Sequence, residues 1–111
     1  MILSGWVSIK DIEDSFDAPG ALKGCQVLYA DYETEDYEGS AQVVYIGPDG
    51  ELYEATGSHC SCNGLEGQWS PGRVTIESLL MRPELDEEFR KLLIAVKVLG
   101  VQAYSVTHVL D

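Results

Sequence analysis

The spacing of apolar residues changes along the chain, and each change predicts a different element. Near the start, Ile9, Ile12 and Phe16 recur at helical spacing. Ser8 and Asp11 have the spacing of a capping pair, and the sequence DAPG follows Phe16. We therefore expect a short helix near the N-terminus that ends before the proline.

Three strands are predicted in the next part of the chain. The segment CQVLYADYETEDY, which starts at Cys25, is rich in β-branched and aromatic residues. The segment AQVVYI that follows is apolar on both faces and predicts a central strand, and ELYEAT predicts the third. The sequence GPDG between the last two has the residues of a hairpin turn. Short connections of this kind favour an antiparallel meander.

Two more helices are predicted after the strands. VTIESLLMR has an apolar helical face, with Thr75 as its N-cap. We expect Pro83 to begin the next helix, PELDEEFRKLLIAVKVLG, in which acidic residues crowd the first turn, lysines come late and Gly100 ends the pattern. Residues 101–111 alternate between apolar and polar and fit an added strand.

Together these elements predict a single α+β domain over residues 1–111. Its expected architecture is a three- or four-stranded antiparallel sheet packed on one face by about three helices. No run of residues has transmembrane length, and the first residues lack the pattern of a signal peptide, so we expect no membrane partner and a cytoplasmic protein. We also expect its three cysteines to be reduced.

Charge narrows the possible partners. The chain has 19 acidic and 7 basic residues, which gives a formal net charge of -12. So negative a protein is not expected to bind nucleic acid directly. Its charge serves solubility, or it attracts cations or a protein with a basic surface.

The acidic charge is densest in the segment DYETEDYEG. One interpretation is a docking surface for a basic protein, in which carboxylates replace phosphates and tyrosines replace stacked bases. The other is a solvated strand end whose charges prevent sheets from pairing edge to edge. The candidate partner-binding residues are Asp31, Tyr32, Glu33, Glu35, Asp36, Tyr37 and Glu38.

The segment GSHCSCNGLEGQW at 57–69 concentrates residue types that carry chemistry. His59, Cys60 and Cys62 are zinc-ligand types, but neighbours on a strand face opposite sides, so one metal could take all three only if the chain bends. A fourth ligand, such as Cys25 or His108, would have to come from elsewhere. We therefore expect no cofactor, with zinc as the alternative.

The same segment has two other interpretations. Cys60 or Cys62 could be a nucleophile with His59 or His108 as its base, although no signature of a cysteine hydrolase surrounds them and enzyme activity is not favoured. Alternatively the segment is structural, with buried cysteines, a hydrogen-bonded turn, and a tryptophan that plugs the sheet against the helix at 75–82. The motif residues concerned are His59, Cys60, Cys62, Asn63, Glu66, Gln68 and Trp69.

The segments LYADYETEDYEGSAQVVY, GELYEATGSHCSCNGLEGQWSP and VTIESLLMR resemble a group of small proteins encoded by bacteriophages and prophages, which share the motif GSHCSC-x-x-LEGQW and are largely of unknown function. The resemblance covers roughly residues 25–82. It departs at YEAT, where an apolar residue and an asparagine precede the glycine in the group, and at SPGR, where the group has EPEE.

This resemblance implies a phage accessory protein, made in the cytoplasm of a bacterial host, and it implies no reaction. With the charge, it predicts a protein that acts by binding a host protein. One form of that function is an anti-CRISPR-like inhibitor of a nucleic-acid-handling defence system with a nucleic-acid-mimicking surface. The alternative is a metal- or thiol-site protein that uses the HCSC cluster.

Overall fold

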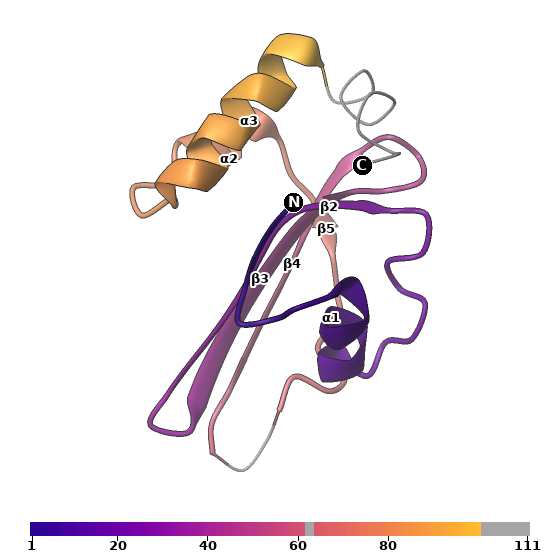
Figure 1. The fold of residues 1–111 in the computed structure, drawn as a ribbon, viewed down its shortest axis with the longest axis vertical. Coiled ribbons are helices and arrows are strands. Elements are labelled where there is room, and N and C mark those ends of the chain that lie inside the picture. Colours follow the sequence, from indigo (N-terminus) through magenta and orange to yellow (C-terminus); the bar gives the residue numbers. More distant parts are fainter. Residues whose placement is uncertain (62–63, 101–111) are drawn as a thin grey trace.

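The computed structural model describes residues 1–61 and 64–100, and in this part of the chain three helices pack on a five-stranded sheet (Figure 1). The strands follow the order β1-β2-β3-β4-β5 across the sheet. The α+β class predicted from the sequence is confirmed. In chain order, the elements are β1 (Ile2–Ser4), α1 (Ile9–Phe16), β2 (Gln26–Glu35), β3 (Glu38–Ile46), β4 (Leu52–His59), β5 (Gly72–Arg73), α2 (Ile76–Leu80) and α3 (Glu87–Leu99).

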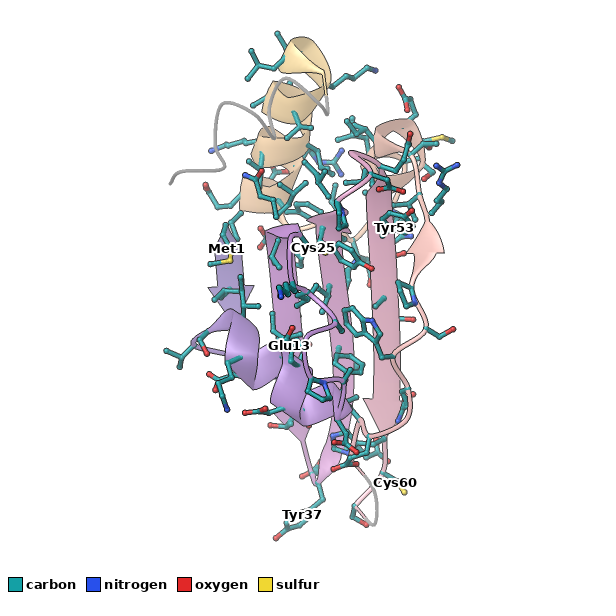
Figure 2. All side chains as sticks on the ribbon, turned by 90° about the vertical axis from the view of Figure 1, so that its right-hand side faces the viewer. Met1, Glu13, Cys25, Tyr37, Tyr53 and Cys60 are labelled. Carbon is teal, nitrogen blue, oxygen red and sulfur yellow. The ribbon has the colours of Figure 1, made fainter. Side chains whose placement is uncertain are left out.

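The three long strands form the predicted antiparallel meander. β2 and β3 are joined by a two-residue turn, in which Asp36 and Tyr37 have φ angles of 51° and 67°. Positive φ at both central residues is typical of the type I′ turn, whose twist matches that of the strands. Figure 2 shows Tyr37 projecting from this end of the hairpin. In the predicted turn between β3 and β4, the Gly50 N–H donates to the Gly47 carbonyl at 2.9 Å.

The sheet differs from the prediction in size and in strand direction. It is mixed, because β1 runs parallel to β2, with Ile2 opposite Tyr29. A parallel pair needs a crossover connection, and the segment that contains α1 provides it. The two strands that the sequence analysis missed, β1 and β5, have only 3 and 2 residues. Segments this short carry too few alternations to predict a strand.

The helices cover both faces of the sheet, and the prediction of one covered face is wrong. α1 lies on one side of the sheet in Figure 1, whereas α2 and α3 lie on the other. On β3, Val43 and Tyr45 belong to the core under α1, and Val44 and Ile46 belong to the core under α2 and α3. Because successive residues of a strand face opposite sides, a run of four apolar residues requires a covering layer on each side.

The helix ends follow local capping. The predicted capping of α1 by Ser8 and of α2 by Thr75 is confirmed. The prediction that the last helix begins at Pro83 is wrong, because Asp86 is its N-cap and its carboxylate accepts the Phe89 N–H at 3.0 Å. Gly100, with a φ angle of 85°, ends α3 as expected. The strand suggested for 101–111 lies outside the described residues.

Candidate functional site

Four carboxylates lie together on one face of the sheet. Tyr32 packs in the core under α1, so its neighbours on β2, Asp31 and Glu33, face the opposite side. Glu35 shares that side and is paired across the strands with Glu38. In Figure 1, this end of the β2–β3 hairpin extends beyond α2 and α3, which cover the same face further along. We call Asp31, Glu33, Glu35 and Glu38 the acidic surface.

Two hollows border the acidic surface. The first, of about 620 Å³, lies between β2 and the segment that joins α2 to α3, and Asp31, Glu33, Glu84 and Asp86 contribute its carboxylates. The second, of about 630 Å³, is lined by Glu33, Glu35 and Glu38 with polar groups of β3 and β4. Since Glu33 borders both hollows, the acidic surface is continuous from the hairpin to α3.

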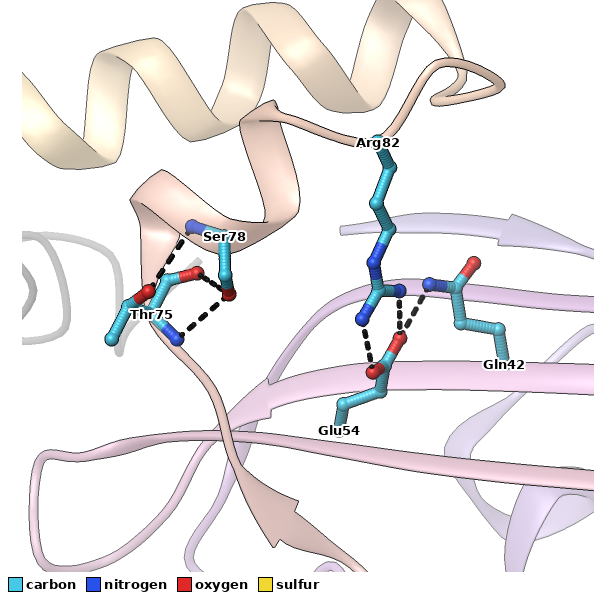
Figure 3. Close-up of polar contacts among 5 residues, drawn as sticks. All are labelled: Gln42, Glu54, Thr75, Ser78 and Arg82. Atoms are coloured by element: carbon cyan, nitrogen blue, oxygen red, sulfur yellow. Dashed lines mark hydrogen bonds and ion pairs between the residues drawn. The ribbon is translucent and has the colours of Figure 1, made fainter.

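One cation lies close to this surface, and it is already paired. Arg82 donates to both carboxylate oxygens of Glu54, at 2.5 and 2.7 Å, and Gln42 donates to the same carboxylate at 2.7 Å (Figure 3). Burial alone would raise the pKa of Glu54, but the hydrogen bonds from Arg82 and Gln42 outweigh it and lower the pKa. Arg82 is therefore neutralised by Glu54, and no salt bridge within the described residues compensates the carboxylates of the acidic surface.

The negative potential extends to a tyrosine at the edge of the first hollow. Tyr29 stacks on Phe89, with ring centroids 4.3 Å apart. Its pKa is raised to about 12, first by burial and then by the charges of Asp31, Asp86 and Glu33. The carboxylates of the hollow therefore act together on one hydroxyl group.

The structure divides the predicted partner-binding residues. Asp31, Glu33, Glu35 and Glu38 form the acidic surface, as described above. Asp36 and Tyr37 occupy the hairpin turn, where Tyr37 is 84% exposed. Tyr32 does not join them, because it stacks on Trp6 under α1 with ring centroids 5.1 Å apart. It is half-buried there and cannot serve as a stacking platform for a partner on the acidic side.

His59 ends β4 with both ring nitrogens engaged. Its Nδ1 lies 2.9 Å from the carbonyl oxygen of Cys60, and its Nε2 lies 2.6 Å from the hydroxyl oxygen of Tyr32. A carbonyl oxygen only accepts, so Nδ1 carries the proton and, in the neutral ring, the Tyr32 hydroxyl donates to Nε2. The ring covers Gly39, where a Cβ atom would lie only 2.2 Å from Nε2. His59 is therefore a packed and hydrogen-bonded group at the strand end.

Gln68 and Trp69 hold the segment after β4 against the sheet. The Gln68 side chain forms two hydrogen bonds with the peptide groups of Ser58, at 2.9 and 2.8 Å. Trp69 packs edge-on against Phe16 of α1, at 5.1 Å between centroids, and stacks on Tyr45 at 5.9 Å. The prediction that Trp69 packs against the helix at 75–82 is wrong, because that helix covers the other face.

The remaining motif residues do not form a described cluster. Cys60 is exposed, which contradicts its expected burial, and Glu66 is exposed as well. Cys62 and Asn63 lie outside the described residues. Figure 2 shows Cys25 toward the end of the sheet opposite Cys60, so Cys25 is not placed to complete a metal site with it.

The metal and nucleophile interpretations that use His59 both need it to change partners, whereas His108, the alternative base, lies outside the described residues. To bind zinc through Nε2 it would have to release Tyr32, and to act as a base for Cys60 it would need a nitrogen that is not already bonded. Over residues 1–61 and 64–100, no group of three His, Cys, Asp or Glu side chains is arranged to hold a metal ion. Because Cys62 and His108 are not among these residues, the zinc and the nucleophile interpretations both stay predictions.

Four residues beside the acidic surface come from distant parts of the chain and were not predicted from the sequence. Glu84 and Asp86 come from the segment before α3, and Glu54 and Arg82 form the neighbouring ion pair. Strand alternation was the one available signal, because it puts Asp31, Glu33 and Glu35 on a common face. It could not show that α2 and α3 would pack on this same face.

Comparisons with protein-family models, with curated proteins and with solved structures gave no match. Within the described part of the chain, no helix combines the length and the apolar composition needed to cross a membrane.

Proposed function

We propose that this protein is a small phage accessory protein that binds a host protein, and that its acidic surface docks on a basic face of that partner. The observation that carries the proposal is the position of Asp31, Glu33, Glu35 and Glu38 on the part of the sheet that α2 and α3 leave uncovered. A pleated surface with charged side chains on alternate residues offers a basic partner a row of like charges at fixed spacing.

The distribution of the protein's own cations supports this proposal. Six of the seven basic side chains form salt bridges within the described residues, and none of these bridges uses a carboxylate of the acidic surface. A charge that served solubility alone would not require the carboxylates of one surface to remain without ion pairs. The pairs are Lys10–Asp14, Arg73–Glu51, Arg82–Glu54, Arg90–Glu87, Lys91–Glu88 and Lys97–Glu77.

The spacing of the carboxylates also bears on nucleic-acid mimicry. Asp31, Glu33 and Glu35 are two residues apart along β2, which corresponds to about 6.8 Å between successive side chains. One strand of duplex DNA carries a phosphate about every 3.4 Å along its axis. The row therefore has about half the charge density of one DNA strand. Such a row can occupy part of a nucleic-acid site on the partner, and that would inhibit a host defence protein by competition.

Affinity capture with matched variants tests the proposed function. The immobilised protein is exposed to bacterial lysate at low salt beside two variants that each lose three charges. E33Q/E35Q/E38Q removes part of the acidic surface, and E51Q/E77Q/E88Q removes exposed carboxylates elsewhere. A partner that binds the parent and the second variant but not the first supports the proposal. Equal capture by all three contradicts it. Release of the captured partner by added DNA or RNA supports mimicry.

A further inference from the structure

The hollow between β2 and the segment before α3 has both a polar and an aromatic lining. Asp31 and Glu33 border it from the sheet, and Glu84 and Asp86 border it from the opposite side. The rings of Tyr29 and Phe89 lie in its wall, together with Leu85. Its volume of about 620 Å³ far exceeds that of a single side chain. It can therefore admit a side chain together with its neighbouring backbone.

A hydroxyl group without a partner lies in this hollow. Tyr29 is only 9% exposed, and within the described residues its hydroxyl has no hydrogen-bond partner. The charges that act on this hydroxyl come from Asp31, Asp86 and Glu33, which all line the hollow. The ring of Tyr29 is buried but its hydroxyl oxygen remains accessible, so a ligand that enters the hollow can hydrogen-bond to it.

We propose that this hollow receives an arginine side chain of the basic partner, with the Tyr29 hydroxyl and the carboxylates around it as the acceptors. This inference rests on the protein-binding function proposed above. It specifies which side chain of the partner binds next to the acidic surface. Asp31, Glu33, Glu84 and Asp86 supply negative charge from two sides, and the phenol oxygen accepts a further hydrogen bond. Among residues 1–61 and 64–100, no salt bridge involves these four carboxylates, because Arg82, the cation in the lining, is bound to Glu54.

The chemistry of the lining favours arginine over lysine. A guanidinium group has five donors in a planar fork, which can reach acceptors on two walls at once, whereas an ammonium group is a compact point charge. The ion pair at the edge of the hollow already shows this recognition, because Arg82 binds Glu54 through two nitrogens while Gln42 binds the same carboxylate. The hollow beside it presents further carboxylates, and Arg82 in its lining is already bound to Glu54.

A titration with short peptides tests this inference independently of the natural partner. The probes are acetyl-Gly-Arg-Gly-amide and its lysine and citrulline analogues, added to the isotopically labelled full-length protein and followed by NMR. The expected result is saturable shifts of the backbone amides at Asp31, Glu33, Glu84 and Asp86 with the arginine peptide. Binding should be weaker with lysine and absent with citrulline, which has nearly the same shape without the charge.

Variants separate binding in the hollow from general attraction to a negative protein. E33Q/E84Q should weaken the arginine peptide about tenfold or more, whereas E51Q/E77Q removes the same charge elsewhere and should change affinity less than twofold. Tyr29→Phe should weaken it about fivefold, because it removes one acceptor and keeps the ring. The melting temperature of Tyr29→Phe should equal or exceed that of the parent, since a hydroxyl without a partner does not stabilise the fold.

Three results would overturn the arginine site. The first is chemical shifts that do not saturate, and the second is shifts of equal size with the citrulline peptide. The third is displacement of the peptide by calcium chloride but not by sodium chloride at the same ionic strength, because that result would indicate a metal site. The outcome is separable from that of the proposed function. If the arginine peptide binds saturably in the hollow while the host partner is captured equally by the parent and by E33Q/E35Q/E38Q, only the proposed function is contradicted. If capture of the host partner depends on the acidic surface while the arginine peptide does not bind, only the arginine site is contradicted.

Discussion

The side-chain amide of Gln68 pairs with Ser58 as a neighbouring strand would. Its Oε1 accepts the Ser58 N–H at 2.9 Å, and its Nε2 donates to the Ser58 carbonyl at 2.8 Å and to the Gly64 carbonyl at 3.0 Å. β5 pairs with β4 only opposite Tyr53 and Glu54, so Gln68 satisfies backbone groups further along the same edge. An edge closed in this way is less available for pairing with another chain.

Replacing Gln68 should therefore destabilise the fold. We expect Gln68→Ala to lower the free energy of unfolding by about 1–2 kcal/mol, because it removes three hydrogen bonds that are partly accessible to water. Gln68→Glu should cost at least as much, since a carboxylate cannot donate to the two carbonyl groups. Urea denaturation measures both, with Glu66→Gln as a neighbouring control that should stay within about 0.5 kcal/mol of the parent. A Gln68→Ala protein as stable as the parent would show that the pairing with Ser58 contributes nothing.

Trp69 should be coupled energetically to α1 and not to α2. Trp69→Ala removes a half-buried ring from between Phe16 and Tyr45 and should cost about 2–3 kcal/mol. In double-mutant cycles, Phe16→Leu should show a coupling energy of about 0.5 kcal/mol or more with Trp69→Ala, because the two rings touch. Leu79→Ala, on the opposite face, should be additive with it. Coupling to Leu79 instead would contradict the assignment of these residues to two separate cores.

The two-sided core could have been deduced from β3 alone. Val43, Val44, Tyr45 and Ile46 form an unbroken apolar run, and the sequence analysis recognised it as apolar on both faces. Such a run needs a layer of structure on each side, but the prediction placed all the helices on one side. The apolar stripe of a helix shows which side of the helix is buried. It does not show against which face of the sheet the helix packs, so the sequences of α1 and α3 could not predict how the helices divide between the two faces.

The site was predictable to the extent that it follows strand alternation. The common face of Asp31, Glu33 and Glu35 required only the period of two residues. The same rule puts Tyr32 on the other face, so Tyr32 could have been separated from the carboxylates on the sequence alone. The contacts of Tyr32 with His59 and of Arg82 with Glu54 join residues 27 and 28 positions apart, and no local pattern predicts them.

The pair formed by Arg82 and Glu54 should make stability depend on acid pH. The Glu54 side chain is 10% exposed, and breaking the pair with Arg82→Met should cost about 2 kcal/mol near pH 7. The pKa of Glu54 is lower in the folded protein than in the unfolded chain, so the pair stabilises above the unfolded value of about 4.3. This contribution is lost as the pH falls through the folded pKa.

Urea denaturation between pH 3 and pH 7 measures this loss. The difference in unfolding free energy between the parent and Arg82→Met should shrink below about pH 4. Arg73→Met is the control, because Arg73 and Glu51 are both exposed and 3.7 Å apart, and it should change stability by no more than about 0.5 kcal/mol at any pH. A difference for Arg82→Met that stays constant over the whole range would contradict the role of the Glu54 charge.

Tyr37 should strengthen binding of the host partner and lower the free energy of unfolding. A bulky residue at a φ angle of 67° is strained, and the second central position of a type I′ turn favours glycine. Tyr37→Gly should therefore stabilise the fold by about 0.5–1 kcal/mol while weakening binding of the captured partner, because it removes an 84% exposed ring flanked by carboxylates. Tyr37→Phe keeps the ring and should leave both quantities unchanged. Unaltered binding by Tyr37→Gly would exclude the turn from the interface.

Association kinetics over a salt series test the central claim most directly. For the captured host partner, the association rate of the parent protein should fall steeply as salt rises, because charges of opposite sign steer the encounter. E33Q/E35Q/E38Q should associate about tenfold more slowly at low salt and depend less on salt, and E51Q/E77Q/E88Q should behave like the parent apart from the smaller effect of its reduced net charge. Equal rates and equal salt dependence for the two variants would show that the acidic surface does not direct binding, and would contradict the proposed function.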